Sequence, residues 1–236
     1  MKKKSYLMLA ALGLMASAAV FQSCDNDDNN DYSLAYPNAI VTVKPNADNS
    51  QFYLQLDDST TLTPTNIKQS PFGNKEVRAL VNYYRSDANA GHYSQAVYVN
   101  WIDSILTKNV VEGLGSSEEN NKKYGADPLE IVNDWVTVAE DGYLTLRFRT
   151  RWGGREKHLL NLVHRSDVNK PYYYTLHQDA KGDTSGQVGD GLVAFKLIDA
   201  VDAEHPDKTD TLTLEWQSYS GKKTARFKFR VNGAKK

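Results

Sequence analysis

The only cysteine in the chain, Cys24, is the residue whose chemistry is most specific. A thiolate is the nucleophilic form of this side chain, and it can take a diacylglycerol through a thioether bond. Cys24 follows three lysines, an apolar run from Leu7 to Phe21 and a short polar dipeptide. A basic segment, an apolar core and small residues before a cut site define a secretory signal. The pattern predicts a lipoprotein signal peptide over residues 1–23, whose removal leaves a lipid-bearing Cys24 at the N-terminus.

The apolar run of about 15 residues is shorter than the ~20 that a helix needs to cross a bilayer. A cleaved signal is therefore favoured over a transmembrane anchor. The alternative, an ordinary signal peptide with an incidental cysteine, is disfavoured because this exported chain has no other cysteine. Without a second cysteine there is no disulfide, so the fold must be stabilised by buried apolar surface.

About 213 residues follow the predicted cut site, which is enough for one large or two small domains. The first of them, residues 24–36, begin with a run of aspartates and asparagines, which predicts a solvated, acidic, lipid-anchored tether. Without the three signal-peptide lysines, 25 basic and 29 acidic residues remain. Such a nearly neutral body argues against nucleic acid as a partner, because nonspecific binding depends on releasing phosphate counterions.

From residue 37 onward, strand-length runs alternate with turn residues. About five predicted strands over residues 37–112 favour a small barrel, because closure removes sheet edges. Residues 113–130 open with a stretch of glycine, serine, glutamate, asparagine and lysine, which predicts a linker. Seven predicted strands over residues 131–236 favour a two-sheet sandwich. The sequence predicts an all-β protein with no helix outside the signal peptide.

Six segments spread over the mature chain form a recognisable series: the acidic tether, Leu56 to Pro64, Arg78 to Tyr83, Asp127 to Ile131, Asp141 to Arg149 and His158 to Val163. In this order they resemble the NigD-like lipoproteins of Bacteroides-type bacteria. The resemblance implies an N-terminal OB-like barrel and a C-terminal β-sandwich. It supplies no catalytic or binding residues and no cofactor.

Residue types suited to catalysis occur without a recognisable constellation. His158, His164 and His177, with Asp134 or Asp179, could hold zinc in principle, but His158 and His164 are separated by about 20 Å of extended strand. The sequence contains no His-Glu-x-x-His motif and no nucleophile elbow. We therefore predict a protein that is not an enzyme and has no metal or cofactor; a surface hydrolase or metal enzyme remains the alternative.

Two basic stripes are the best candidate for a binding site. One comprises Arg147, Arg149 and Arg151, and the other Arg226, Lys228 and Arg230. If the stripes were adjacent, they would form a patch suited to an anionic ligand. The alternative is that they pair across strands with acids such as Glu215.

Other residues suggest contact with sugars. Aromatic side chains that could stack on a saccharide are Tyr53, Tyr84, Trp101 and Trp152, although packing explains most such residues. In the bacteria of the similar family, Asp-Ser/Thr-x tripeptides carry O-glycans, and Ser59 lies in such a tripeptide within a predicted turn.

Together these features predict an outer-membrane lipoprotein that is anchored by its N-terminal lipid and faces the cell exterior. Its predicted role is a binding or accessory module with a glycan or protein ligand. A structural envelope protein is a further alternative.

Overall fold

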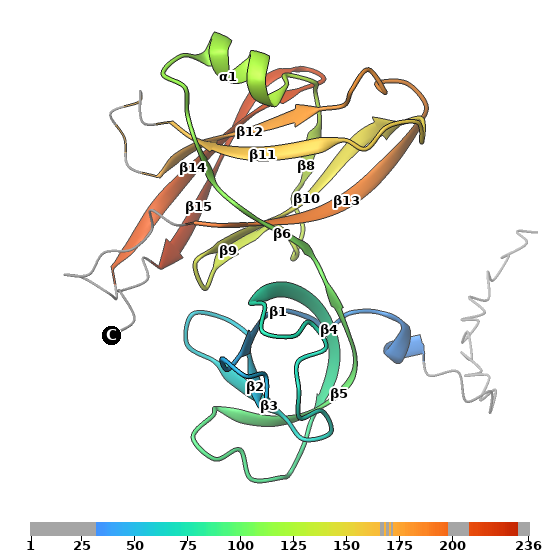
Figure 1. Ribbon diagram of the computed structural model, residues 1–236, viewed down its shortest axis with the longest axis vertical. Helices are drawn as coiled ribbons and strands as arrows, with labels where there is room; N and C mark the ends of the chain where they lie inside the picture. The colour runs from blue at the N-terminus through green and yellow to red at the C-terminus, as the bar shows by residue number, and fades with distance from the viewer. Residues whose placement is uncertain (1–31, 166–167, 169, 171, 198–207, 231–236) are drawn as a thin grey trace, which may run out of the picture. The chain divides into compact units, whose positions relative to one another are not determined.

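The computed structural model describes residues 32–165, 168, 170, 172–197 and 208–230 (Figure 1). Cys24 and the predicted signal peptide lie outside this part of the chain. The described residues from Ser33 onward belong to one compact unit. Among the described helices, none has the length and apolar character needed to cross a membrane.

The elements are, in chain order, the 3-10 helix η1 (Tyr32–Ala35), β1 (Ala39–Pro45), β2 (Phe52–Gln55), β3 (Thr61–Pro64), β4 (Val77–Arg85), β5 (Gln95–Ser104), β6 (Leu106–Asn109), β7 (Val111–Glu112), α1 (Ser117–Tyr124), β8 (Glu130–Val132), β9 (Val138–Glu140), β10 (Tyr143–Trp152), β11 (Leu159–His164), β12 (Tyr173–Asp179), β13 (Gln187–Lys196), β14 (Thr209–Ser218) and β15 (Gly221–Arg230).

The first five strands form a closed barrel with the order β1-β2-β3-β5-β4. Successive residues of a strand point to opposite faces, so alternate side chains enter the barrel. Val41, Val43 and Leu54 are among the fully buried residues of its core. Closure leaves these strands without a free sheet edge. The predicted small barrel is confirmed.

The remaining strands form the two sheets of the predicted sandwich. One has the order β6-β13-β10-β8, with β9 also paired to β10, and the other has the order β15-β14-β12-β11-β7. Leu144 and Leu146 from the first sheet and Leu162, Tyr174 and Leu214 from the second meet in one apolar core. The predicted all-β architecture of barrel followed by sandwich is confirmed.

The connection between barrel and sandwich differs from the prediction. The sequence places residues 106–112 at the end of the barrel, but β6 pairs in parallel with β13 and β7 pairs in parallel with β11. Side-chain alternation indicates the two faces of a strand without naming its partner. For that reason the pattern could not assign these strands to the sandwich.

Helix α1 is the second difference, because the sequence predicts no helix in the 113–130 linker. Ser116 caps the helix by accepting a hydrogen bond from the Glu119 backbone N–H, and its hydroxyl also contacts the Glu119 carboxylate at 2.9 Å. The Ser-x-x-Glu spacing is that of a capping box, but here the Glu119 carboxylate accepts from the Ser116 hydroxyl instead of the Ser116 backbone N–H. The helix has almost no apolar residues and therefore shows no amphipathic period. The Ser-x-x-Glu pattern was the signal available.

Buried polar contacts join the barrel to the sandwich. Arg78 of β4 is completely buried and donates from Nη2 to Glu140 Oε1 at 2.6 Å, and from Nε and Nη1 to Thr145 and Thr42. Burial raises the pKa of the Glu140 carboxyl, although the neighbouring Arg78 opposes the shift. Lys44 of β1 makes a second ion pair, 2.8 Å long, with Asp141. In both ion pairs the barrel supplies the cation and the sandwich supplies the acid.

Candidate functional site

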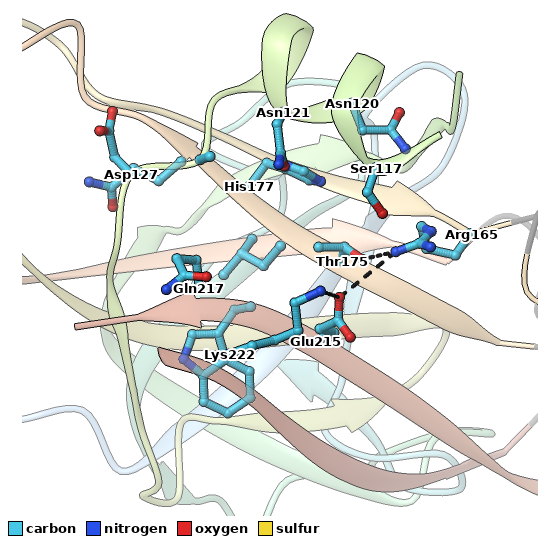
Figure 2. A pocket seen from close by; sticks show the side chains of 14 residues that line it. Ser117, Asn120, Asn121, Asp127, Arg165, Thr175, His177, Glu215, Gln217 and Lys222 are labelled. Atoms are coloured by element: carbon cyan, nitrogen blue, oxygen red, sulfur yellow. Dashed lines mark hydrogen bonds and ion pairs between the residues drawn. The ribbon is translucent and has the colours of Figure 1, made fainter. Parts of the chain in front are cut away.

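A polar cavity of about 70 Å³ lies between α1 and the β12–β14 part of the second sheet (Figure 2). Side chains from α1, the segment after it, β12, β14 and the start of β15 converge there. Its lining includes Asn120, Asn121, Arg165, His177, Gln178, Glu215, Trp216 and Lys222. We call it the α1 pocket.

Gly125 places α1 close to the sheet. It ends the helix with φ +88°, a conformation that L side chains rarely adopt, and its backbone N–H bonds to the Asn121 carbonyl. A Cβ at this position would lie 2.2 Å from the Gln178 carbonyl oxygen, so only glycine permits this approach. The helix therefore rests directly on β12.

A hydrogen bond to the turn that ends α1 determines the tautomer of His177 on β12. Its Nδ1 lies 2.7 Å from the Gly125 carbonyl oxygen, which can only accept, so Nδ1 carries the proton. Burial lowers the pKa of the imidazole, and the nearby Arg165 guanidinium lowers it further. The ring is thus neutral near pH 7, and Nε2 is left as an acceptor.

Glu215 of β14 contacts both cationic side chains of the α1 pocket. Its Oε2 accepts from the Tyr173 hydroxyl at 3.0 Å, and its Oε1 lies 3.1 Å from Lys222 Nζ and 3.8 Å from Arg165 Nη1. Burial and the bond to Glu215 raise the pKa of the Tyr173 phenol. With Asp127 also in the lining, two acids balance two cations. The pocket therefore favours a neutral polar group over a strongly charged one.

Three lining residues keep a buried polar atom unpaired among the described residues. They are Asn120 Nδ2, Gln178 Oε1 and Trp216 Nε1, and these side chains are 1%, 2% and 6% exposed. A buried polar atom without a partner costs about 1–3 kcal/mol. Native proteins contain few such atoms. Gln178 and Trp216 share strand parity with the core residues Leu176 and Leu214, so their side chains point between the two sheets, and only Asn120 lies on the α1 side of β12 and β14.

None of these pocket residues except His177 and Glu215 was considered from the sequence. The lining comes from positions between 117 and 222, and the sequence does not show that they converge. The Ser-x-x-Glu spacing from Ser116 to Glu119 was the one local signal that could have placed α1.

The first basic stripe does lie on one face of β10, but its charge is largely paired. Arg147 contacts Asp134 at 2.8 Å and Asp190 at 2.7 Å, and Arg149 contacts Asp190 at 2.6 Å. Hydrogen bonds from Arg149 and Arg147 lower the pKa of Asp190 to about 2, so it stays ionised. Cross-strand pairing thus holds for Arg147 and Arg149, with Asp190 rather than Glu215 as the main acid.

The second stripe lies on another sheet. Arg226, Lys228 and Arg230 belong to β15, at the edge of the second sheet, whereas Arg147, Arg149 and Arg151 belong to β10 in the first. Arg230 donates to the Asp58 carbonyl of the barrel at 3.1 Å. The two stripes are not neighbours within one sheet.

The three histidines considered for zinc have different partners. His158 Nε2 contacts the Asp183 carbonyl at 3.0 Å, His164 contacts Glu112 at 3.3 Å, and His177 contacts Gly125. Asp134 pairs with Arg147 and Asp179 pairs with Lys181. Within the described ranges, no group of three or more His, Cys, Asp or Glu residues is arranged to hold a metal.

Ser59 lies exposed in the predicted turn, where Asp57 Oδ1 accepts from the backbone N–H groups of Ser59 and Thr60. Its candidate O-glycosylation stays a prediction. Of the four aromatic candidates, Trp152 is the most exposed, Tyr84 stacks on Tyr98, Tyr53 packs near Tyr93, and Trp101 donates to the Leu34 carbonyl.

Two domain families match the chain. The NigD-like N-terminal OB domain matches residues 40–105, and the NigD-like C-terminal beta sandwich domain matches residues 112–229. The chain belongs to the NigD-like family. The predicted family and the OB character of the barrel are confirmed.

Solved structures agree with this NigD-like assignment. A protein from Parabacteroides distasonis whose name relates it to a toxin is 33% identical, with a TM-score of 0.65 over 82% of this chain and 92% of its own. A NigD-like immunity protein from Bacteroides caccae is 20% identical, with a TM-score of 0.57 over 82% and 97%. A protein from Bacteroides fragilis named as a lipoprotein is 12% identical, with a TM-score of 0.51 over 84% and 98%. A comparison with curated protein sequences gave no match.

Proposed function

We propose that this NigD-like protein is a lipid-anchored binding module on the cell surface that holds the end group of a glycan in the α1 pocket. It has no catalytic role in this proposal. The observation that carries the binding proposal is the convergence of polar side chains from α1, β12, β14 and β15 on one cavity (Figure 2), among them Asn121, His177, Glu215 and Lys222.

The size and polarity of the α1 pocket define the ligand class. Its volume of about 70 Å³ is well below the ~300 Å³ at which sites begin to enclose a drug-sized molecule. It can therefore take one end of a longer ligand. A hydroxyl group both donates and accepts hydrogen bonds, so it can donate to His177 Nε2 and accept from Asn121 or Lys222. The terminal sugar of a glycan presents several such hydroxyls on a small body.

A glycan array tests this proposal with the full mature chain carrying Cys24→Ser, which keeps it free of lipid. We expect the array to identify a bound glycan that is recovered uncleaved. Lys222→Ala should weaken its binding about tenfold, because Lys222 orients Glu215 in the pocket, and hydrogen bonds to charged groups contribute about 1.5–3 kcal/mol.

Lys223→Ala is the matched control. Lys223 is the next residue of β15, but its Nζ contacts Glu130 at 2.9 Å and it does not line the pocket. Binding by this variant should equal that of the parent. Equal losses in the two lysine variants, or an array without any bound glycan, would reject the α1 pocket as the site.

The proposed anchor rests on the sequence before Cys24, and the surface location rests on the acidic tether after it. The structurally similar Bacteroides fragilis protein carries the name lipoprotein. We expect the parent chain to remain with the outer membrane and the Cys24→Ala variant to be released from it. Added protease should degrade the parent on intact cells. Protection until the outer membrane is permeabilised would indicate that the protein faces the periplasm.

A further inference from the structure

Half of strand β13 has an open edge. β13 pairs with β10 along its whole length, but on its other side β6 covers only residues 193–196. Among the described residues, no strand pairs with this edge at residues 187–192. In a sheet, alternate residues direct their backbone N–H and C=O groups to opposite neighbours. About three residues of this stretch therefore offer backbone groups toward the open edge.

The open half of β13 has one charged residue, Asp190, and its charge is neutralised by Arg147 and Arg149 of β10. The outer strand of the second sheet, β15, carries Lys222, Lys223, Arg226 and Lys228. Such charges prevent unwanted strand pairing. The open part of β13 instead contains Val188, exposed to solvent, and two glycines. This edge is thus suited to receive another strand.

An apolar groove of about 430 Å³ lies on the inner side of this edge. Phe148, Trp152 and Leu160 line it together with Gly189 and Gly191, and Trp152 is 56% exposed. A Cβ at Gly191 would lie 2.5 Å from the Phe148 ring, whereas one at Gly189 would meet nothing within 4 Å. The glycines thus leave room beside the aromatic wall.

A second groove, of about 400 Å³, lies on the outer side of the same stretch. It is lined by Tyr36, Trp135, Arg147 and Leu192, and Trp135 is 55% exposed. Asp190 and Gly191 line both grooves. An added strand would send alternate side chains to opposite faces, and each face has a groove beside an exposed indole.

We propose that an extended peptide segment of a partner protein adds as a strand to β13 along residues 187–192. The segment continues the line of β6, which already pairs with the other half of this edge. Main-chain hydrogen bonds supply affinity in this mode, and pockets for alternate side chains supply specificity. The peptide carries apolar residues at alternate positions.

Charge favours an acidic partner segment over a second copy of this chain. Arg155 and Lys157 line the inner groove, and Arg151 lies opposite Val188 across the sheet. Within the described part of the chain, Arg151, Arg155 and Lys157 have no charged partner. Of the two acids that line the inner groove, Asp190 is paired with arginines and only Glu156 is unpaired. Two copies would bring these cations together, whereas acidic residues flanking an apolar segment would pair with them.

A phage library of random decapeptides tests the proposal on the full mature chain carrying Cys24→Ser. We expect selected peptides with alternating apolar residues and acidic flanks. In one such peptide, backbone N-methylation at every second residue should weaken binding about tenfold, because a lost hydrogen bond costs up to about that factor. Methylation of the intervening residues should have little effect. Equal tolerance of both methylation patterns, or no selected peptide, would overturn strand addition.

Two variants locate the site. Trp152→Ala should weaken peptide binding about tenfold or more, since buried indoles dominate interfaces. Tyr84→Ala, which removes an exposed aromatic ring from the barrel, should leave it unchanged. Lys222→Ala should also leave it unchanged, which separates this site from the α1 pocket. Dimers in sedimentation with amide protection at residues 187–192 would make a second copy the occupant and overturn the partner assignment.

Discussion

Replacing Arg78 by alanine should lower the free energy of unfolding by about 3–5 kcal/mol, the cost of leaving a buried charge without its partner. The guanidinium has no exposure, and it bonds to Glu140 and to two threonines, one in each domain. Its loss leaves Glu140 mostly buried and unpaired. Urea unfolding followed by tryptophan fluorescence measures the change.

Two controls isolate the charge. Arg85→Ala removes an exposed arginine from the end of the same strand and should change stability by no more than about 0.5 kcal/mol. The double variant Arg78→Met/Glu140→Leu removes both charges and should recover much of the loss, because well-packed apolar pairs often replace buried ion pairs without cost. If Arg78→Ala proved no worse than Arg85→Ala, the ion pair would not hold the domains together.

The second large effect is expected for Gly125→Ala. Holding alanine in this positive-φ conformation costs about 1–3 kcal/mol. The new Cβ would also lie 2.2 Å from the Gln178 carbonyl oxygen, which is backbone and cannot rotate away. We expect a total loss of at least about 3 kcal/mol, displacement of α1 and loss of glycan binding. Chemical denaturation and the glycan assay measure the two effects.

Gly115→Ala is the comparison that separates strain from collision. Gly115 has φ +91°, but nothing lies within 4 Å of the position that a Cβ would take there. This variant should lose only the conformational part, about 1–2 kcal/mol, and should keep its glycan affinity. Equal destabilisation in the two variants would mean that contact with β12 does not restrict Gly125.

The sequence predicted the architecture because alternation is a strong local signal. Residues such as Phe52 and Leu54 point to the same face of any strand. Their alternation therefore predicts a strand with one buried face even when its neighbouring strand is unknown. Helix α1 was missed because its residues are polar on all sides, and its stability comes from caps and from contact with β12. A short helix of this kind has no hydrophobic period to detect.

The candidate sites were much less predictable. The sequence shows Arg147 and Arg149 as a basic stripe, but Asp190, which neutralises them, lies about 40 residues away in the sequence. Asn120 and Trp216 came together only through the fold. Neighbours across a sheet depend on strand order, which a single sequence does not specify. Residue types therefore indicate which chemistry is possible at each position, but the strand order determines which of these side chains meet and which charges are neutralised.

The segment at residues 106–112 restricts how the protein can be divided. Most of it, residues 106–111, lies between the two family matches, yet it supplies one edge strand to each sheet of the sandwich. A fragment cut at residue 113 would lack both strands and expose the edges of β13 and β11. Newly bared edges promote aggregation. The two domains thus have separate folds, but the sandwich depends on residues 106–111, which precede its family match. A truncated or recombined gene would encode a complete sandwich only if the cut fell before Leu106.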